Sequence, residues 1–269
     1  MRQSRGYECH PHADSPVRLT RVYVEGDLSP GSIVELPRDT AAHLAKVLRT
    51  RVGDEIVLFN GDGREFPGAI ESLRGARVSA SIGAARAIDR ESSCAITLLQ
   101  CVPRGDRMDF IVQKATELGV ARIVPLLSQR SVVRLDHGQA ESKQAHWRGV
   151  AISACEQCGR NRLPHIEAAQ PLLNYLGSIA PAAASAPAPL RLVLDPGPSD
   201  AKAGQRVHAA EIAIGPEGGF APEELEAFQL SSFSRLTLGP RILRTETAAI
   251  AAVIMLQARF GDMSVWSDN

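Results

Sequence analysis

Two glycine-rich segments, each directly after a short apolar run, constrain the fold of this chain more than any other feature. Residues 211–214 (Glu-Ile-Ala-Ile) lead into Gly-Pro-Glu-Gly-Gly-Phe at 215–220, and residues 235–238 (Arg-Leu-Thr-Leu) lead into Gly-Pro-Arg-Ile-Leu-Arg at 239–244. Strand ends of this kind commonly bind ligands in α/β proteins, because their backbone amides and carbonyls are unpaired. We therefore predict that the two segments border one shared pocket. The alternative is that both are only tight turns.

Each glycine-rich segment is followed by a predicted helix. Pro222 followed directly by acidic residues is typical of the first turn of a helix. Before the apolar run 248–256, Thr245 or Thr247 can cap a helix by accepting a backbone N–H. Neither segment has the lysine or the glycine spacing of a phosphate-binding loop, and the first one carries Glu217. We therefore expect a ligand that is neutral or cationic at its reactive centre.

The composition narrows the class of protein. The chain has 269 residues and a formal net charge of zero, so any contact with nucleic acid must come from local patches. Its five cysteines form no even framework, and zinc or redox chemistry at Cys155 and Cys158 is a minor alternative because no second pair accompanies them. We expect no metal. No apolar window approaches the ~20 residues of a membrane span, and we expect a cytoplasmic protein.

Residues 17–90 are expected to form a small β-rich domain behind a flexible extension at 1–16. Short apolar runs at 18–24, 32–36, 55–59 and 77–82 are separated by turn signals, including Asn-Gly and Asp-Gly at 60–63. A helix capped by Asp39 or Thr40 interrupts them. Strands at this spacing are typical of a barrel or a sandwich. Basic residues on the helix and the first strand form either an RNA-contacting patch or an ordinary solvated face.

Residues 91–269 are expected to form an α/β domain. An apolar run at 95–102 reads as a buried parallel strand, and a helix over 106–118, a strand over 122–127 and a helix over 140–158 follow it. A further strand at 190–194 comes after an Ala/Pro run at 178–189. Alternation of strands and helices predicts a doubly wound α/β sheet.

The two glycine-rich segments also resemble a known family. Gly-Pro-Glu-Gly-Gly-Phe at 215–220 and Leu-Gly-Pro-Arg-Ile-Leu-Arg-Thr-Glu-Thr-Ala at 238–248 are similar to the RsmE-type 16S ribosomal RNA methyltransferases of the SPOUT superfamily. Gln-Lys-Ala-Thr-Glu-Leu-Gly-Val at 113–120 and Glu-Gln-Cys-Gly-Arg at 156–160 extend the resemblance over most of the chain.

The resemblance implies a fold and an activity. The fold is a PUA-like RNA-binding β-barrel at 17–90 joined to a SPOUT methyltransferase domain with a trefoil knot at 91–269. The activity is S-adenosyl-L-methionine-dependent methylation of uridine N3 in 16S rRNA of the small ribosomal subunit, by a homodimer. Alternatives are another SPOUT enzyme that methylates tRNA or a ribose 2′-oxygen, and a non-catalytic RNA-binding assembly factor.

The resemblance also implies site residues. Cofactor-binding positions lie on three strand ends: Leu194, Gly215, Pro216, Glu217, Gly218, Gly219, Leu238, Gly239, Ile242, Leu243 and Thr247. RNA-contacting candidates are basic residues spread over both domains: Arg18, Arg21, His43, Arg49, Arg130, Arg160 and Arg241. His43 can equally be a surface histidine.

Methylation of uracil N3 requires that its proton leaves, so the site needs a base or a cation that stabilises the deprotonated ring. Arg241 or Arg244 can supply the stabilising cation, and we predict Arg244; we name Glu156 as a catalytic carboxylate. Glu217 and Glu246 are alternative proton acceptors, and charge complementation of the helix N-terminus is an equally good explanation of Glu246.

Overall fold

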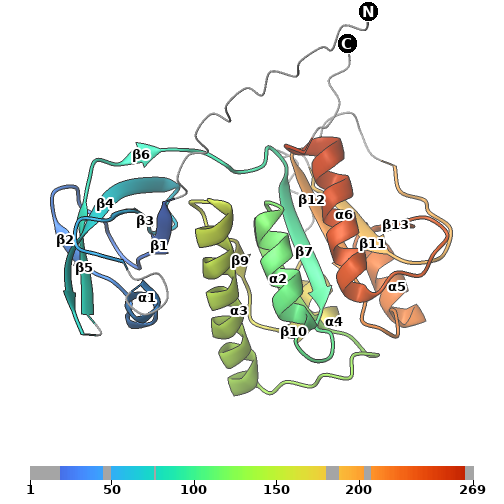
Figure 1. The fold of residues 1–269 in the computed structure, drawn as a ribbon. Helices are drawn as coiled ribbons and strands as arrows, with labels where there is room; N and C mark the ends of the chain where they lie inside the picture. The colour runs from blue at the N-terminus through green and yellow to red at the C-terminus, as the bar shows by residue number, and fades with distance from the viewer. Residues whose placement is uncertain (1–18, 45–49, 76, 180–187, 203–206, 264–269) are drawn as a thin grey trace, which may run out of the picture. The chain divides into compact units, whose positions relative to one another are not determined.

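The computed structural model describes residues 19–44, 50–75, 77–179, 188–202 and 207–263 (Figure 1). The predicted extension at 1–16 and residues 180–187 of the Ala/Pro run lie outside these residues. The chain divides into two compact units, one made of the residues up to Leu58 with Phe66–Ala85, and the other of Phe59–Glu65 with the residues from Arg86 onwards.

The first unit is built around an antiparallel sheet. The strands of this sheet are β1 (Thr20–Tyr23), β2 (Ile33–Glu35), β3 (Glu55–Phe59), β4 (Arg64–Arg74), β5 (Arg77–Ile82) and β6 (Arg86–Ala87). Of these, β6 and the β4 residues that pair with it, Arg64 and Glu65, are counted in the second unit. They pair in the order β1-β3-β4-β5-β2, with β6 on β4, and no pairing among the described residues joins β1 to β2. The four predicted runs form strands, whereas β4, the longest, was not predicted.

Helix α1 (Arg38–His43) lies in the first unit and begins differently from the prediction. Its N-cap is Pro37, and no side chain accepts a capping hydrogen bond. The predicted caps, Asp39 and Thr40, are therefore wrong, because both residues are already inside the helix. Buried apolar residues of the strands and α1 form one core, which includes Leu44, Leu58 and Phe66.

The second unit contains a seven-stranded sheet whose registered pairs are all parallel. Its strands are β7 (Ala95–Cys101), β8 (Arg122–Leu127), β9 (His165–Ile166), β10 (Gln170–Pro171), β11 (Leu190–Leu194), β12 (Ala209–Ile214) and β13 (Ser234–Leu236). The order is β10-β8-β7-β12-β11-β13, with β9 on β8. The predicted parallel α/β sheet is confirmed, and its strand order reverses between β7 and β12, where such sheets bind ligands.

Helices cover both faces of this sheet (Figure 1). They are α2 (Arg107–Glu117), α3 (His137–Cys158), α4 (Leu172–Ser178), α5 (Pro222–Leu230) and α6 (Thr245–Phe260). Successive strand residues point to opposite faces. Leu98 accordingly packs in a core with α2, α3 and α6, whereas Leu99 packs in a second core with α4 and α5. The central strands β7, β8, β11 and β12 are mostly apolar because both faces of the sheet are covered.

In the described part of the chain, no helix is both long and apolar enough to cross a lipid bilayer.

Candidate active site

A cavity of about 670 Å³ lies at the carboxyl ends of β11, β12 and β13. Its size is in the range of sites for small molecules. Three chain segments and the start of α2 supply its walls: Arg107, Leu194, Asp195, Pro196, Ile214, Gly215, Pro216, Glu217, Gly218, Gly219, Thr237, Leu238, Gly239, Pro240, Arg241, Ile242, Leu243, Arg244, Thr245 and Ala248. The two glycine-rich segments therefore meet in one cavity, as predicted.

The predicted cofactor residues all line this cavity except Thr247, which is exposed on α6. Glycine is required at two lining positions by backbone conformation. Gly219 and Gly239 have φ angles of 67° and 71°, which L-residues with a side chain rarely adopt. A Cβ added at either position would meet no atom within 4 Å.

Thr245 joins the two glycine-rich segments. Its hydroxyl donates a hydrogen bond of 2.8 Å to the carbonyl of Gly215 and accepts one of 3.0 Å from Nε2 of Gln100 on β7. The N-cap of α6 is Arg244, which makes no side-chain capping bond. The prediction that Thr245 or Thr247 caps this helix is therefore wrong, because the Thr245 hydroxyl bonds to the neighbouring loop instead.

Arg107, at the start of α2, is a site residue that sequence reasoning missed. Its Nη1 lies 2.6 Å from Oε1 of Glu217, which also accepts a 3.3 Å bond from the backbone N–H of Arg104. Nε of Arg107 lies 4.0 Å from Oε1 of Glu246. One guanidinium thus contacts carboxylates of both glycine-rich regions. The sequence carried a signal that could have identified Arg107, because this residue follows the carboxyl end of a predicted parallel strand, where such sheets bind ligands.

Three predicted arginines lie at or next to the cavity. Arg241 and Arg244 are exposed and line it. Arg130, in the loop after β8, donates a 3.1 Å hydrogen bond from Nη1 to the carbonyl of Gly218. Cationic groups therefore border a cavity whose walls are otherwise mostly backbone and apolar side chains.

Two predicted residues at the end of α3 lie away from the cavity. Glu156 is on the last turn of α3 and does not line it. Arg160 is 4% exposed and donates to the carbonyls of Thr116 and Val120, which precede β8, and to Glu91. The end of α3 therefore lies at the amino edge of the parallel sheet, opposite the cavity. The guanidinium of Arg160 is therefore held by internal partners, and its predicted RNA contact stays a prediction.

The other predicted RNA contacts lie in the first unit. Arg21 is half-buried on β1. Arg18 and Arg49 fall outside the described residues. His43 ends α1, and its side chain is not among those the structure describes.

The cysteine pair on α3 is reduced. Cys155 is buried, and its thiol donates a 3.6 Å bond to the carbonyl of Arg162. The pKa of Cys158 is lowered from its ordinary value, chiefly by hydrogen bonding with Cys155 and further by the backbone and charge of Arg160, against an opposing effect of burial. Among the described residues, no group of three or more metal-ligating side chains comes together.

Two protein-family models match this chain. Residues 90–257 match the RNA methyltransferase domain, and residues 36–82 match the RNA methyltransferase PUA domain. The chain is 31% identical to ribosomal RNA small subunit methyltransferase E of Buchnera aphidicola subsp. Schizaphis graminum, over 92% of this chain and 99% of that protein. It is 32% identical to the protein of that name from Bacillus subtilis, over 78% of this chain and 84% of the other.

A solved structure is similar in both sequence and fold. A ribosomal RNA small subunit methyltransferase E from Neisseria gonorrhoeae, bound to S-adenosyl methionine, superimposes with a TM-score of 0.82. The sequences are 35% identical over 91% of this chain and 100% of that chain.

Proposed function

This chain belongs to the RNA methyltransferase family, and from that premise we propose that it methylates N3 of one uridine in 16S rRNA with S-adenosylmethionine as the methyl donor. The observation that carries the proposal is the cavity at the ends of β11, β12 and β13, where two glycine-rich segments are joined by Thr245. The relatives' names supply the substrate class, and the cavity supplies a place for the cofactor.

The cavity fits S-adenosylmethionine by its size and donor set. Its volume of about 670 Å³ suits a molecule of this size. Apolar side chains such as Leu194, Leu238 and Leu243 suit an adenine ring, while Glu217 and Asp195 suit the cationic ends of the cofactor. The described lining contains no lysine and no phosphate-loop spacing. We propose that the predicted cofactor residues of the two glycine-rich segments and Leu194 hold it there.

When bound, the cofactor supplies an electrophilic methyl group whose bonding electrons remain on sulfur as it leaves. The chain's own residues must make the uracil nitrogen nucleophilic. N3 carries a proton, and its loss leaves negative charge on the ring and its carbonyl oxygens. We propose that Arg244 stabilises this charge, because it is a cationic side chain that lines the cavity and makes no ion pair in the described residues.

The contacts and positions of the three candidate glutamates limit which of them can accept the proton. Glu217 is engaged by Arg107 and by the backbone of Arg104, so one of its oxygens is already committed. Glu246 has an oxygen, Oε2, that is buried and without a hydrogen-bond partner among the described residues, but this residue does not line the cavity. Glu156 lies at the far edge of the sheet, so its catalytic role requires a second copy of the chain.

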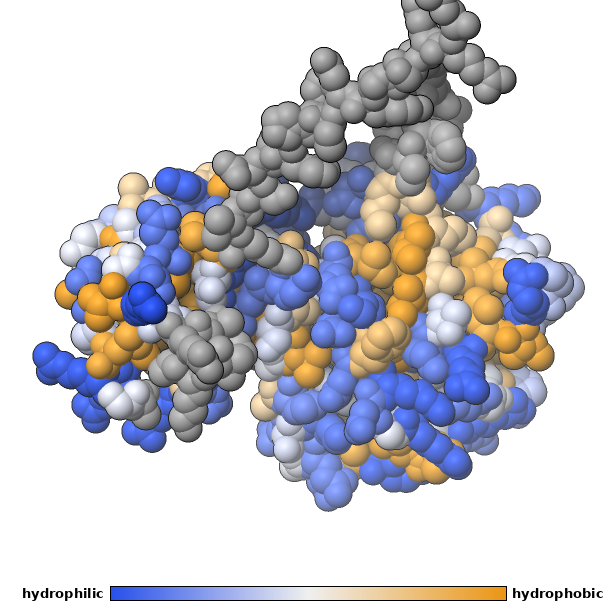
Figure 2. All heavy atoms as spheres, in the orientation of Figure 1, coloured by the Kyte–Doolittle hydropathy of each residue, from blue (hydrophilic) through white to orange (hydrophobic). Residues whose placement is uncertain are grey.

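We propose that such a second copy is present. Figure 2 shows apolar residues gathered over α6. Ile254 of α6 and Phe110 of α2 are 41% and 45% exposed, and the two helices pack against each other in the second unit. A homodimer covering this surface would bury apolar area that water otherwise meets. A single mass equal to one chain by light scattering at micromolar concentration contradicts the dimer.

We further propose the finer features of the fold that the resemblance implied. A PUA-like barrel over 17–90 would hold the RNA, with Arg21 among its contacts and a cytoplasmic ribosomal subunit as partner. A trefoil knot over the methyltransferase domain is supported by the strand order. β13 pairs with β11, yet α6, which follows it, packs back against β12 and β7.

The proposed function is tested by transfer of labelled methyl from S-adenosylmethionine. The substrates are small subunits from a strain lacking this protein, large subunits from the same strain, and tRNA. We expect label in the small subunits alone. Label in tRNA identifies a different RNA substrate. Cofactor binding without transfer to any RNA identifies a non-catalytic assembly factor.

A further inference from the structure

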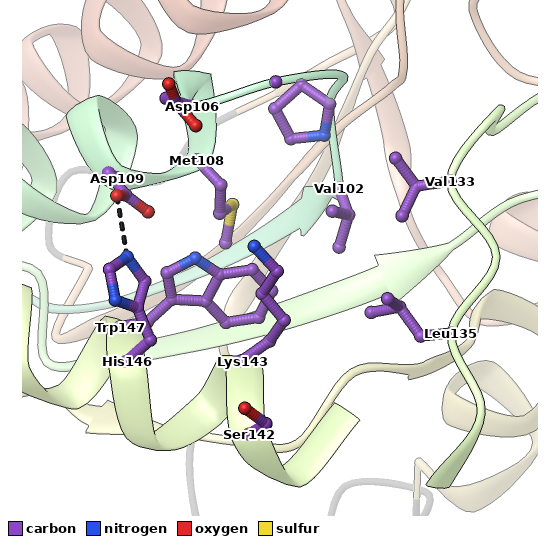
Figure 3. Close-up of a pocket in the computed structure, with 12 residues that line it drawn as sticks. Val102, Asp106, Met108, Asp109, Val133, Leu135, Ser142, Lys143, His146 and Trp147 are labelled. Atoms are coloured by element: carbon purple, nitrogen blue, oxygen red, sulfur yellow. Dashed lines mark hydrogen bonds and ion pairs between the residues drawn. The ribbon is translucent and has the colours of Figure 1, made fainter. Parts of the chain in front are cut away.

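A second cavity, of about 590 Å³, lies between α2, α3 and the segment 133–135 (Figure 3). It opens at the carboxyl end of β7, on the same edge of the sheet as the proposed cofactor cavity. No residue lines both cavities. Two of its residues, Val133 and Leu135, belong to the stretch 128–137, which the sequence indicates as a candidate RNA-facing loop. None of its residues is among the individually predicted site residues, and nothing in the proposed methyl transfer uses them.

The floor of this cavity is apolar and its rim is polar. Trp147 is 1% exposed, and Met108 is buried beside it, with Val133 on the opposite wall. On the rim, Nε2 of His146 lies 2.7 Å from Oδ2 of Asp109, and Lys143 extends from α3 (Figure 3). If the carboxylate of Asp109 accepts from Nε2, the other ring nitrogen of His146 remains available to a ligand.

One short segment separates the two cavities. Val102, Pro103 and Gly105 line the second cavity. The backbone N–H of Arg104 and the side chain of Arg107 bind Glu217 in the wall of the first. A ligand that fills both cavities therefore needs only to cross residues 104–107. A polymer with one reacting unit in the first cavity has its next units close to the second.

We propose that this second cavity, called the flanking pocket from here on, binds one unstacked nucleotide that neighbours the methylated uridine. The proposal rests on the proposed function. Sequence-specific RNA recognition mostly uses splayed bases, which pack on apolar or aromatic surfaces and form hydrogen bonds along their edges. The flanking pocket offers both, with Lys143 as a cation for a carbonyl or a phosphate oxygen and the His146–Asp109 pair for a base edge.

The test uses variants that either obstruct the flanking pocket or remove a charged side chain from it, without disturbing the fold. Ser142 and Lys143 are exposed on α3 and line the pocket, so substitution there does not open a core. Ser142→Trp obstructs the pocket, and Ala145→Trp places the same bulk at an exposed position of α3 outside it. Lys143→Ala removes a charge from the pocket, and Arg148→Ala removes one from α3 outside it.

For each variant, the affinity for small subunits is measured by filter binding, the cofactor affinity by calorimetry, and kcat and KM by methyl transfer. We expect Ser142→Trp and Lys143→Ala each to weaken subunit binding and raise KM by about tenfold. Cofactor affinity and the two controls should stay within about twofold of the parent protein.

Unchanged affinity for small subunits in both pocket variants contradicts the proposal that the flanking pocket binds a nucleotide. A loss of the dimer mass in Ser142→Trp also contradicts it, because that result would assign the cavity to a contact between protein chains. These outcomes are separate from failure of the proposed function. If the parent protein methylates no RNA, the filter-binding difference between pocket variants and controls still decides whether the pocket holds a nucleotide.

Discussion

The hydroxyl of Thr245 lies 2.8 Å from the carbonyl oxygen of Gly215, to which it donates a hydrogen bond. The two residues are 30 positions apart in the chain. Gly215 begins the first glycine-rich segment, and Thr245 directly follows the second. Thr245 is 5% exposed. A buried side chain at the start of α6 therefore fixes the separation of the two loops that form the proposed cofactor cavity.

Replacing Thr245 with valine keeps the shape of the side chain but removes this bond and the one from Gln100. Loss of buried hydrogen bonds whose partners stay unsatisfied costs about 1–3 kcal/mol of unfolding free energy. We expect Thr245→Val to lower stability by this amount and to weaken S-adenosylmethionine binding. Urea unfolding and calorimetry measure the two effects.

Thr245→Ser retains the hydroxyl and should restore most of the cofactor affinity. Thr247→Val is the matched control, because Thr247 is exposed and lies outside the cavity. Equal losses in Thr245→Val and Thr247→Val would show that the bond to Gly215 does not hold the site together.

Arg107 should matter for cofactor binding more than for stability. Its ion pair with Glu217 is partly exposed, with side-chain exposures of 41% and 36%, so solvent screens it and its contribution to folding is below about 1 kcal/mol. We expect Arg107→Ala to weaken S-adenosylmethionine binding by about tenfold, because the loop 215–220 loses one of the side chains that hold it in place.

A double-mutant cycle tests this explanation of Arg107. In a Glu217→Gln background, Arg107→Ala should have a much smaller effect on cofactor affinity, since the two side chains act through one contact. If the losses of cofactor affinity from the two substitutions are fully additive, Arg107 acts independently of Glu217, which would contradict this explanation.

The two cavity arginines should differ in what they control. We expect Arg244→Ala to lower kcat by about 100-fold with little change in cofactor affinity, because it removes charge stabilisation that exists only during the reaction. Arg241→Ala should instead raise KM for the ribosomal subunit. Equal loss of kcat and of cofactor affinity in Arg244→Ala would assign that residue to cofactor binding.

Adding a side chain at Gly239 should destabilise the protein because of the backbone conformation at this position. Its φ of 71° costs a residue with a Cβ about 1 kcal/mol, although there is open space around it. We expect Gly239→Ala to lower the melting temperature and cofactor affinity. Gly177→Ala gives the opposite sign, because Gly177 lies inside α4 with open space around it, where alanine stabilises. A melting temperature unchanged by Gly239→Ala contradicts the conformational argument.

Much of the second unit was predictable because its signals are local. The strand at 190–194 was predicted with the bounds of β11, and Pro222 begins α5 as expected. The meeting of the two glycine-rich segments followed from the rule that parallel strands share a carboxyl edge. In each case a few neighbouring residues carried the pattern.

The features that were missed depend on contacts between distant residues. β4 carries Pro67 and Gly68, which weaken a strand pattern, and only pairing with its neighbours stabilises it. Thr245 has the residue type of a helix cap, and its bond to Gly215 could not be read from residues near it in the chain. Glu156 lies in the last turn of α3 and Arg160 just after it, and the end of this helix was correctly predicted, but the edge of the sheet that it reaches depends on how α3 packs.

The central claim is tested most directly by the identity of the methylated nucleoside. Small subunits from a strain lacking this protein are incubated with it and with labelled S-adenosylmethionine, and the 16S rRNA is digested to nucleosides and separated. We expect label in 3-methyluridine, incorporated about 100-fold more slowly when Arg244→Ala replaces the parent protein. Label in any other nucleoside, or no label from a protein that binds the cofactor, would contradict the central claim.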